Sequence, residues 1–144
     1  MLCNEIMKRH VFSAKLQTSA ADAARLMKQH GIGFLPVCDE DGHPLGVVTD
    51  RDLALRVCAE NLSAQDVTLS RVMTQSPVSC NAKSTLEQAE AIMLKRKSRR
   101  IVLLDDQEKL VGLITLADVL HHQDPFRVAH FVRELTEVRL RHER

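Results

Sequence analysis

Aromatic residues are scarce in this chain of 144 residues: Trp and Tyr are absent, and Phe occurs four times. Proteins that bind single-stranded nucleic acid stack bases on aromatic rings, and this sequence offers few such rings. The formal net charge is only +1, so it creates no global attraction to nucleic acid or to a membrane surface. We therefore expect neither nucleic acid nor a membrane as a partner.

Long apolar runs and catalytic motifs are missing as well. No segment approaches the roughly 18 apolar residues of a transmembrane helix, and the opening MLCNEIMKRH lacks the apolar stretch of a signal peptide. Asp50 and Asp52 would point in different directions on a helix and do not form a facing acid pair. No nucleophile–base–orienter set is visible elsewhere. The sequence predicts a cytoplasmic protein that is not an enzyme.

Cysteine and histidine show no metal-binding pattern. The seven histidines lack ligand spacing and the four cysteines form no CxxC pair, so we expect no metal and no required cofactor. In an intracellular protein, widely spaced cysteines are more often buried thiols than a disulfide framework. The four are Cys3, Cys38, Cys58 and Cys80.

The strongest positive feature is an internal repeat. Sliding the chain by 66 residues aligns it with itself without a gap, as expected for one supersecondary unit used twice. The stretch GVVTDRDL returns as GLITLADV, with the same Gly, Thr and Asp in the same spacing. These pairs are Gly46 with Gly112, Thr49 with Thr115, and Asp52 with Asp118.

Each repeat predicts the order β-α-β-β-α, which is a mixed α/β (α+β) fold. A short extended piece precedes a helix opened by Ser or Thr, with Ser19–Asp22 and Ser84–Glu87 as capping pairs. Two apolar strands joined by turn-prone residues follow, and then a second helix. The predicted helices cover residues 18–30, 50–60, 84–96 and 116–122, and the predicted strands cover residues 11–14, 33–37, 45–49, 77–80, 100–104 and 110–115.

The domain boundaries follow from the repeat. We predict the first repeat at residues 5–60, a linker at 61–71, the second repeat at 72–123 and an amphipathic C-terminal helix at 124–144. In this last helix Asp124 is the expected N-cap and Pro125 the first helical residue. Its apolar face must be covered by its own module, by a symmetry mate or by another protein.

The repeated Gly-x-x-Thr-x-x-Asp signature has two interpretations. Thr followed three residues later by Asp is a capping-box pattern, which would start the second helix of each repeat. Alternatively, the Gly lets another group approach the strand, and the Thr hydroxyl with the free N–H groups of the helix start forms an anion site. An Asp one turn later could accept hydrogen bonds from a vicinal diol. Phosphate and diol together describe a ribonucleotide.

In combination, these features resemble a tandem pair of CBS domains, named after cystathionine β-synthase and often called a Bateman module. The resemblance covers about residues 5–123, and MKQHGIGFLPV followed by GVVTDRDLAL is especially similar to small stand-alone bacterial CBS-pair proteins. It implies two repeats packed with pseudo-two-fold symmetry around two clefts, commonly paired into homodimers. It also implies sensing of an adenine nucleotide or relative, such as AMP, ADP, ATP, NAD or S-adenosylmethionine.

The resemblance also implies which residues contact the ligand, with Thr toward phosphate and Asp toward the ribose. The first site would use Phe12, Ile32, Gly33, Phe34, Pro36, Thr49, Arg51 and Asp52. The second site would use Val78, Cys80, Ser98, Arg99, Arg100, Ile101, Thr115 and Asp118.

The two repeats depart from the family pattern in different ways. Val102 stands in the second repeat where Pro is usual, and the first repeat has Gly33 and Phe34 in place of the paired arginines. The second site therefore suits phosphorylated ligands better. The basic run KRKSRR at residues 95–100 has three interpretations: a solvated helix end, phosphate contacts by its last two arginines, or a nucleic-acid patch.

The sequence thus favours a regulatory module that senses an adenosyl nucleotide, forms a homodimer and acts on a regulated partner protein. One alternative is a structural dimerisation scaffold in which the Thr and Asp residues only cap helices. Another is a detached regulatory subunit of an enzyme or transporter, without a ligand of its own.

Overall fold

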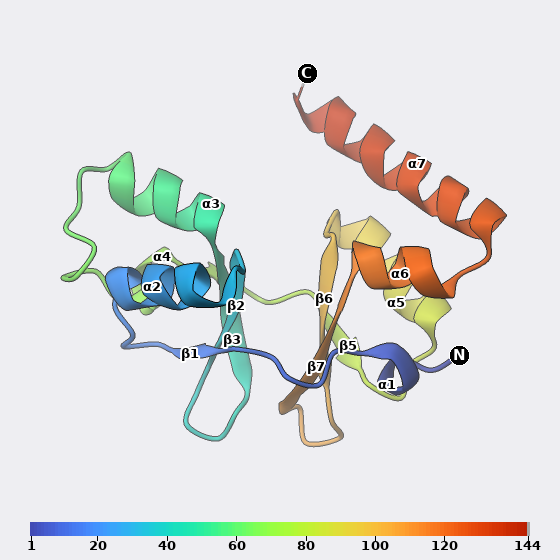
Figure 1. Cartoon of the computed structure of the whole chain (residues 1–144), viewed down its shortest axis with the longest axis horizontal. Coiled ribbons are helices and arrows are strands. Elements are labelled where there is room, and N and C mark those ends of the chain that lie inside the picture. Colours follow the sequence, from blue (N-terminus) through green and yellow to red (C-terminus); the bar gives the residue numbers. More distant parts are fainter. Residues whose placement is uncertain (144) are drawn as a thin grey trace. The chain divides into compact units, whose positions relative to one another are not determined.

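The computed structural model describes residues 1–143, with side chains described as far as residue 137. The chain forms two compact units (Figure 1). The first-repeat unit consists of Phe12–Pro77. The second-repeat unit combines Met1–Val11 with Val78–Arg144. Each unit has its own hydrophobic core.

The first-repeat unit is a four-stranded sheet in the order β1-β2-β3-β4 with helices packed on it. Strand β1 is parallel to β2, whereas β2, β3 and β4 pair antiparallel. Its elements are β1 (Ala14–Lys15), α2 (Ala20–His30), β2 (Phe34–Cys38), β3 (Pro44–Thr49), α3 (Asp50–Leu53), the π-helix η1 (Ala54–Cys58), α4 (Leu69–Val72) and β4 (Thr74–Gln75).

The second-repeat unit has the same plan, with a three-stranded sheet in the order β5-β6-β7. Its elements are α1 (Cys3–Ile6), β5 (Ser79–Asn81), α5 (Leu86–Arg96), β6 (Arg100–Leu104), β7 (Leu110–Thr115), α6 (Leu116–His122) and α7 (Pro125–Glu143). Helix α5 and strands β6 and β7 begin and end 66 residues after α2, β2 and β3. The mixed α/β class, the duplicated element order and the C-terminal helix are therefore confirmed.

The start of each repeat packs onto the other repeat's strands. Residues 1–11 belong to the second-repeat unit, where Lys8 forms an antiparallel bridge with Leu113 of β7. Residues 69–77 belong to the first-repeat unit, where β4 pairs with β3. Leu69 has no exposed surface, so the segment predicted as a linker enters a core before it ends. Neither α1 nor α4 was expected from the sequence.

Side chains cap the first helix of each repeat. The Ser19 hydroxyl accepts a hydrogen bond from the backbone N–H of Asp22, as predicted. In the second repeat the prediction of Ser84 with Glu87 is wrong by one residue. Thr85 is the N-cap and exchanges two hydrogen bonds with Gln88, since Thr85 lies 66 residues after Ser19.

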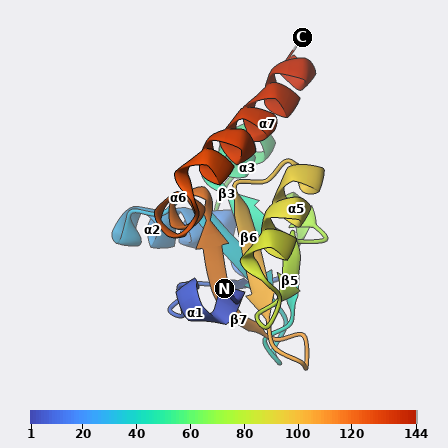
Figure 2. The ribbon, with the colours of Figure 1, turned by 90° about the vertical axis from the view of Figure 1, so that its right-hand side faces the viewer.

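Helix α7 folds back onto its own unit, where it packs on α5 and α6 (Figure 2). Phe131 and Leu135 are 3% and 6% exposed and join the core of that unit. The buried carboxylate of Glu90 on α5 holds the start of this helix: its Oε1 accepts from Gln123 Nε2 at 2.7 Å, and its Oε2 lies 3.4 Å from Arg127 Nε. The structure thus shows one cover for the apolar face of α7.

Every helix within residues 1–143 is too short or too polar to cross a membrane.

Candidate functional site

The repeated Thr and Asp form a complete capping box at the end of β3. Thr49 Oγ1 accepts from the backbone N–H of Asp52 at 3.1 Å, and Asp52 Oδ2 accepts from the backbone N–H of Thr49 at 2.9 Å. Such a cap stabilises a helix start by about 1 kcal/mol. The capping interpretation of GVVTDRDL therefore accounts for the Thr49 hydroxyl and for one of the two Asp52 carboxylate oxygens.

The second repeat has the same arrangement at the end of β7. Asp118 Oδ2 accepts from the Thr115 backbone N–H at 2.8 Å and from the Thr115 hydroxyl at 3.0 Å. The Asp118 backbone N–H lies 3.4 Å from Thr115 Oγ1, a longer bond than its counterpart in the first repeat. Both boxes lie where an antiparallel strand ends and a helix starts.

The other carboxylate oxygen of each Asp faces a basic side chain. Asp52 Oδ1 lies 3.8 Å from Arg56 Nη2, and Asp118 Oδ1 lies 3.9 Å from Lys8 Nζ. The two carboxylate side chains keep 15% and 14% of their surface exposed, so solvent or a ligand can reach them. Each Asp therefore combines a helix cap with a partly exposed acceptor beside a cation.

Neither cation was predicted as a site residue. Arg56 lies four residues after Asp52, on η1, which directly follows α3, so the i,i+4 spacing in a predicted helix could have identified it. Lys8 has no comparable signal, because it reaches Asp118 only through the pairing of the N-terminal segment with β7.

The glycine of each signature makes room for the protein's own backbone. A Cβ atom at Gly46 would lie 2.6 Å from the carbonyl oxygen of Thr74 and 2.8 Å from Met73 Sδ. A Cβ at Gly112 would collide with the side chain of Met7. The close approach expected at these glycines is therefore made by the segment that begins the other repeat.

Several predicted residues of the first site gather around the capping box. Phe34 pairs with Thr49 across β2 and β3, and the Asp50 backbone N–H donates to the Gly33 carbonyl at 3.0 Å. A Cβ at Gly33 would lie 2.6 Å from Asp50 Oδ2, so the Asp50 carboxylate covers this glycine. Asp50 was not among the predicted site residues.

The remaining residues predicted for the first site lie at differing depths. Phe12 is half-buried, and its ring stacks on His30 with centroids 3.8 Å apart and an interplanar angle of 19°. Ile32 is half-buried just after the end of α2, Pro36 is buried in β2, and Arg51 is exposed. Phe12 and Arg51 therefore keep surface for a ligand, whereas Pro36 keeps little.

In the second site, Arg99 precedes β6 and Arg100 is its first residue, next to the capping box. Arg100 pairs with Thr115, and the Leu116 backbone N–H donates to the Arg99 carbonyl at 2.8 Å. The Ser98 hydroxyl holds this turn by donating to the Arg100 carbonyl at 2.7 Å. Arg99 and Arg100 are both exposed, and their backbone lies next to Thr115 and Leu116.

Of the other three residues predicted for the second site, Val78 and Cys80 are half-buried and Ile101 is buried. Val78 accepts a backbone hydrogen bond from Val102, and Cys80 lies beside β6 in β5. Ile101 has no exposed surface and belongs to the hydrophobic core of its unit. We therefore leave Ile101 out of the ligand-contacting residues, since it faces the core side of β6.

Cys3 and Cys80 influence one another's pKa, which the sequence did not predict, and Cys3 Sγ donates to the Thr85 carbonyl at 3.5 Å. Backbone hydrogen bonds from Cys3 and Asn4 to Ser84 and Ala82 hold α1 beside the end of β5. The hydrogen bond from Cys3 lowers the pKa of the Cys80 thiol, although burial opposes the shift. The pKa of Cys3 is raised, chiefly by the same hydrogen bond and then by burial.

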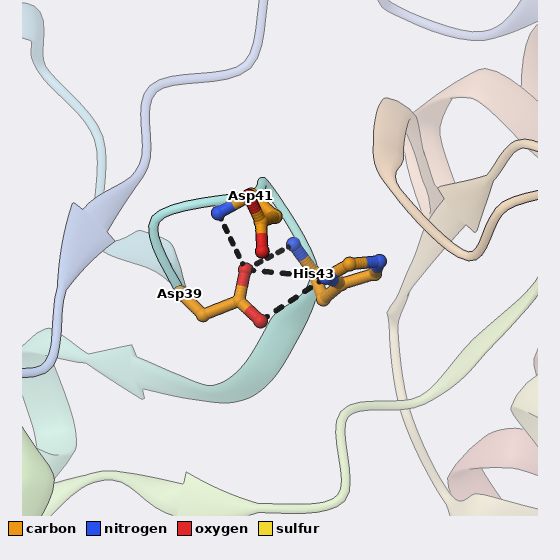
Figure 3. A group of neighbouring side chains, drawn as sticks. All are labelled: Asp39, Asp41 and His43. Atoms are coloured by element: carbon orange, nitrogen blue, oxygen red, sulfur yellow. Dashed lines mark hydrogen bonds and ion pairs between the residues drawn. The ribbon is translucent and has the colours of Figure 1, made fainter.

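Asp39, Asp41 and His43 form a polar cluster in the turn between β2 and β3 (Figure 3). Asp39 Oδ1 accepts from the backbone N–H groups of Asp41 and His43, both at 2.9 Å, and its Oδ2 lies 3.1 Å from His43 Nδ1. The backbone N–H of His43 is the main cause that lowers the pKa of Asp39.

The same turn recurs in the second repeat without a metal-binding set. Asp105 Oδ1 accepts from the backbone N–H groups of Gln107 and Lys109 at 2.8 and 3.0 Å. Lys109 stands where the first repeat has His43. The cluster is therefore explained as a side-chain-stabilised turn, and we assign no metal to it.

Comparison with known families and curated proteins identifies relatives of the whole repeat pair. The model of the CBS domain family matches residues 3–58 and again residues 69–124. The CBS domain-containing protein YhcV of Bacillus subtilis is 37% identical over 119 residues, which cover 83% of both chains. An uncharacterized protein of Methanopyrus kandleri, MK0525, is 28% identical over 131 residues; these cover 91% of this chain and 66% of that longer relative.

Solved structures with the same fold include complexes with adenosine compounds. The CBS domain pair of protein MJ0100, in complex with 5′-methylthioadenosine and S-adenosyl-L-methionine, has a TM-score of 0.74 and 25% identity, covering 84% of this chain and 98% of that one. CBSX2 in complex with AMP has a TM-score of 0.70 and 27% identity, covering 83% and 93%.

Proposed function

Because the chain belongs to the CBS domain family, with two CBS domains in tandem, we propose that it is a regulatory module that binds adenosine-containing ligands. The observation that carries the proposal is the second carboxylate oxygen of Asp52 and of Asp118. Each belongs to a partly exposed side chain, is not the oxygen that caps the helix, and lies beside a basic side chain. Structural relatives that bind AMP, 5′-methylthioadenosine and S-adenosylmethionine support this ligand class.

In the proposed complex, Asp52 and Asp118 accept hydrogen bonds from the ribose hydroxyl groups through Oδ1. The Thr49 hydroxyl accepts from the Asp52 N–H, which leaves its proton to donate to a ligand oxygen. The Thr115 hydroxyl donates to Asp118 Oδ2 and would turn toward a phosphate when the ligand binds. Arg99 and Arg100 lie next to Thr115 and would contact the same phosphate.

Regulation requires the ligand to bind one conformation of the protein better than another, because a ligand shifts an equilibrium only by its difference in affinity. We propose that the module forms a homodimer and that a partner protein responds to the shift. AMP, ADP, ATP, NAD and S-adenosylmethionine are the candidate ligands.

Thermal unfolding with millimolar AMP, ATP or S-adenosylmethionine tests the proposal. A ligand present at 100 times its dissociation constant stabilises the fold by about 2.7 kcal/mol, so the midpoint should rise by several degrees. Asp118→Asn should reduce the shift with AMP, since the amide keeps a capping oxygen but replaces Oδ1 with a donor. Asp106→Asn, an exposed acid of the same unit paired with Lys83, is the control and should keep the shift. An unmoved midpoint with all three ligands would reject the proposal.

The complete capping boxes also support the alternative of a structural scaffold. Under that alternative, Thr49→Ala and Asp52→Ala would lower stability by about 1 kcal/mol each and alter no binding. A detached regulatory subunit would instead co-purify with its enzyme or transporter.

A further inference from the structure

We infer that the two sites select ligands that differ in charge at the 5′ position of the adenosine, an inference that rests on the proposed function. The second-repeat site takes the phosphorylated ligand. The first-repeat site takes an adenosyl ligand whose 5′ substituent is uncharged or cationic, such as a thioether or a sulfonium group.

The contrast begins with two positions that face one another in both repeats. In the first-repeat unit these are Gly33 and Asp50; 66 residues later they are Arg99 and Leu116. Asp50 Oδ2 lies 2.6 Å from the place where a Cβ on Gly33 would stand. A carboxylate therefore occupies, in the first site, the space from which the Arg99 side chain departs in the second.

Two further differences between the repeats also place positive charge in the second site. Arg100 of the second-repeat unit corresponds to Phe34, and Lys8 corresponds to Thr74. Lys8 lies 3.9 Å from Asp118 Oδ1, whereas Thr74 brings no charge to β4. The second site therefore has three cations at positions where the first site has none.

Counting the charged side chains of both sites leaves a clear difference. The first site has two carboxylates, Asp50 and Asp52, and two guanidinium groups, Arg51 and Arg56, for a sum of zero. The second site has Lys8, Arg99 and Arg100 against Asp118, for a sum of +2.

One of the two first-site cations is also engaged elsewhere. Arg56 Nη1 donates to the carbonyl oxygens of Val72 and Met73 at 2.8 and 3.1 Å. Arg51 alone remains to offset Asp50 near a phosphate. A phosphate brought beside Asp50 would meet a like charge, whereas a sulfonium would meet an opposite one.

The matched probes are AMP and 5′-methylthioadenosine, which share adenosine and differ only at the 5′ substituent. Titration calorimetry is carried out on the full chain as two single-site variants. Asp52→Asn retains the second site, where AMP should bind about tenfold or more tightly than 5′-methylthioadenosine. Asp118→Asn retains the first site, where the order should reverse. Added salt should weaken AMP binding to the second site and leave 5′-methylthioadenosine binding to the first nearly unchanged.

An exchange of residues tests whether these positions cause the preference. In the Asp118→Asn background, Gly33→Arg with Asp50→Leu should turn the first site toward AMP. Asp50→Asn alone, which keeps the shape of the side chain, should improve AMP binding by a smaller factor. Circular dichroism establishes that each variant is folded.

The outcomes separate this inference from the proposed function. If neither probe binds the wild-type protein, both fail together. If the probes bind but both sites show the same order of affinity, the inference alone is overturned. It is also overturned if neither Asp50→Asn nor the double exchange changes the ratio of the two affinities.

Discussion

Asp52 and Asp118 each use one carboxylate oxygen to hold a helix start and keep the other beside a basic side chain. A capping box and a ligand site are therefore compatible uses of one residue. At the same scale, Gly46 and Gly112 are explained by the backbone that crosses them rather than by a ligand. In the Gly-x-x-Thr-x-x-Asp signature, the Asp thus caps a helix and offers an acceptor, whereas the Gly makes room for a neighbouring segment of the chain.

The first prediction concerns these glycines. Gly46→Ala should lower the free energy of unfolding by about 1–3 kcal/mol, because its Cβ would lie 2.6 Å from the Thr74 carbonyl oxygen. Gly112→Ala should act similarly through Met7. Gly31→Ala is the comparison: its Cβ meets open space, and only its φ of 63° opposes the change, by about 1 kcal/mol. Urea unfolding measures all three, and an unchanged midpoint for Gly46→Ala would contradict the close approach.

The second prediction concerns the reactivity of Cys80. Its pKa is lowered by the hydrogen bond from Cys3, so its thiolate should form at a lower pH than an ordinary cysteine thiolate does. The rate of alkylation by iodoacetamide increases with pH as the thiolate forms. For Cys80, followed by peptide mass spectrometry, the midpoint of this increase should therefore lie at a lower pH than for an ordinary cysteine. Cys3→Ala removes the donor and should move the rate profile of Cys80 to higher pH. The exposed Cys58 serves as the internal control, and an unmoved Cys80 profile would argue against the shared hydrogen bond.

At the scale of elements, periodicity and the gapless repeat predicted the main helices and strands. The continuous apolar runs RIVLL and LVGLIT, separated by polar residues, were sufficient for β6 and β7, and β6 buries three consecutive residues of its run. Strand β4 and helices α1 and α4 were missed, since two to four residues are too short to show a period. The partners of Asp118 and Gly112 were missed for the same reason: both come from the segment around Lys8.

The third prediction concerns the end of α5. Lys97 has a φ of 57°, in the left-handed region, at the position where α2 has Gly31. Lys97→Gly should raise the free energy of unfolding by about 0.5–1 kcal/mol, because glycine adopts this conformation without steric cost. Lys95→Gly, two residues earlier and inside the helix, should lower it by about 1 kcal/mol. If denaturant unfolding shows both variants to be destabilised, the left-handed cap does not limit stability at Lys97.

At the scale of the whole molecule, each compact unit contains the first residues of the other repeat. The boundaries of the two repeats in the sequence therefore differ from the boundaries of the two hydrophobic cores. Charge complementarity follows this exchange, because Lys8 of the first repeat reaches the Asp of the second. The two candidate sites are accordingly not copies of one another, although their backbones repeat.

The fourth prediction tests whether the first residues of each repeat stabilise the unit of the other repeat. Leu69 is fully buried in the first-repeat unit, so Leu69→Ala should destabilise residues 12–77 by about 2–5 kcal/mol. Amide hydrogen exchange should report the loss of protection there rather than in residues 78–137. Met7→Ala should act on the second-repeat unit, to which Met7 belongs. Protection lost mainly in residues 78–137 on Leu69→Ala would contradict the assignment.

The most direct measurement of the central claim is native mass spectrometry of the full chain with AMP. We predict an AMP adduct on the wild-type protein that persists in Asp106→Asn and is greatly reduced in Asp118→Asn. The same spectra report whether the chain is a homodimer. No adduct at millimolar AMP, or an adduct that is equally abundant in Asp118→Asn, would contradict the account.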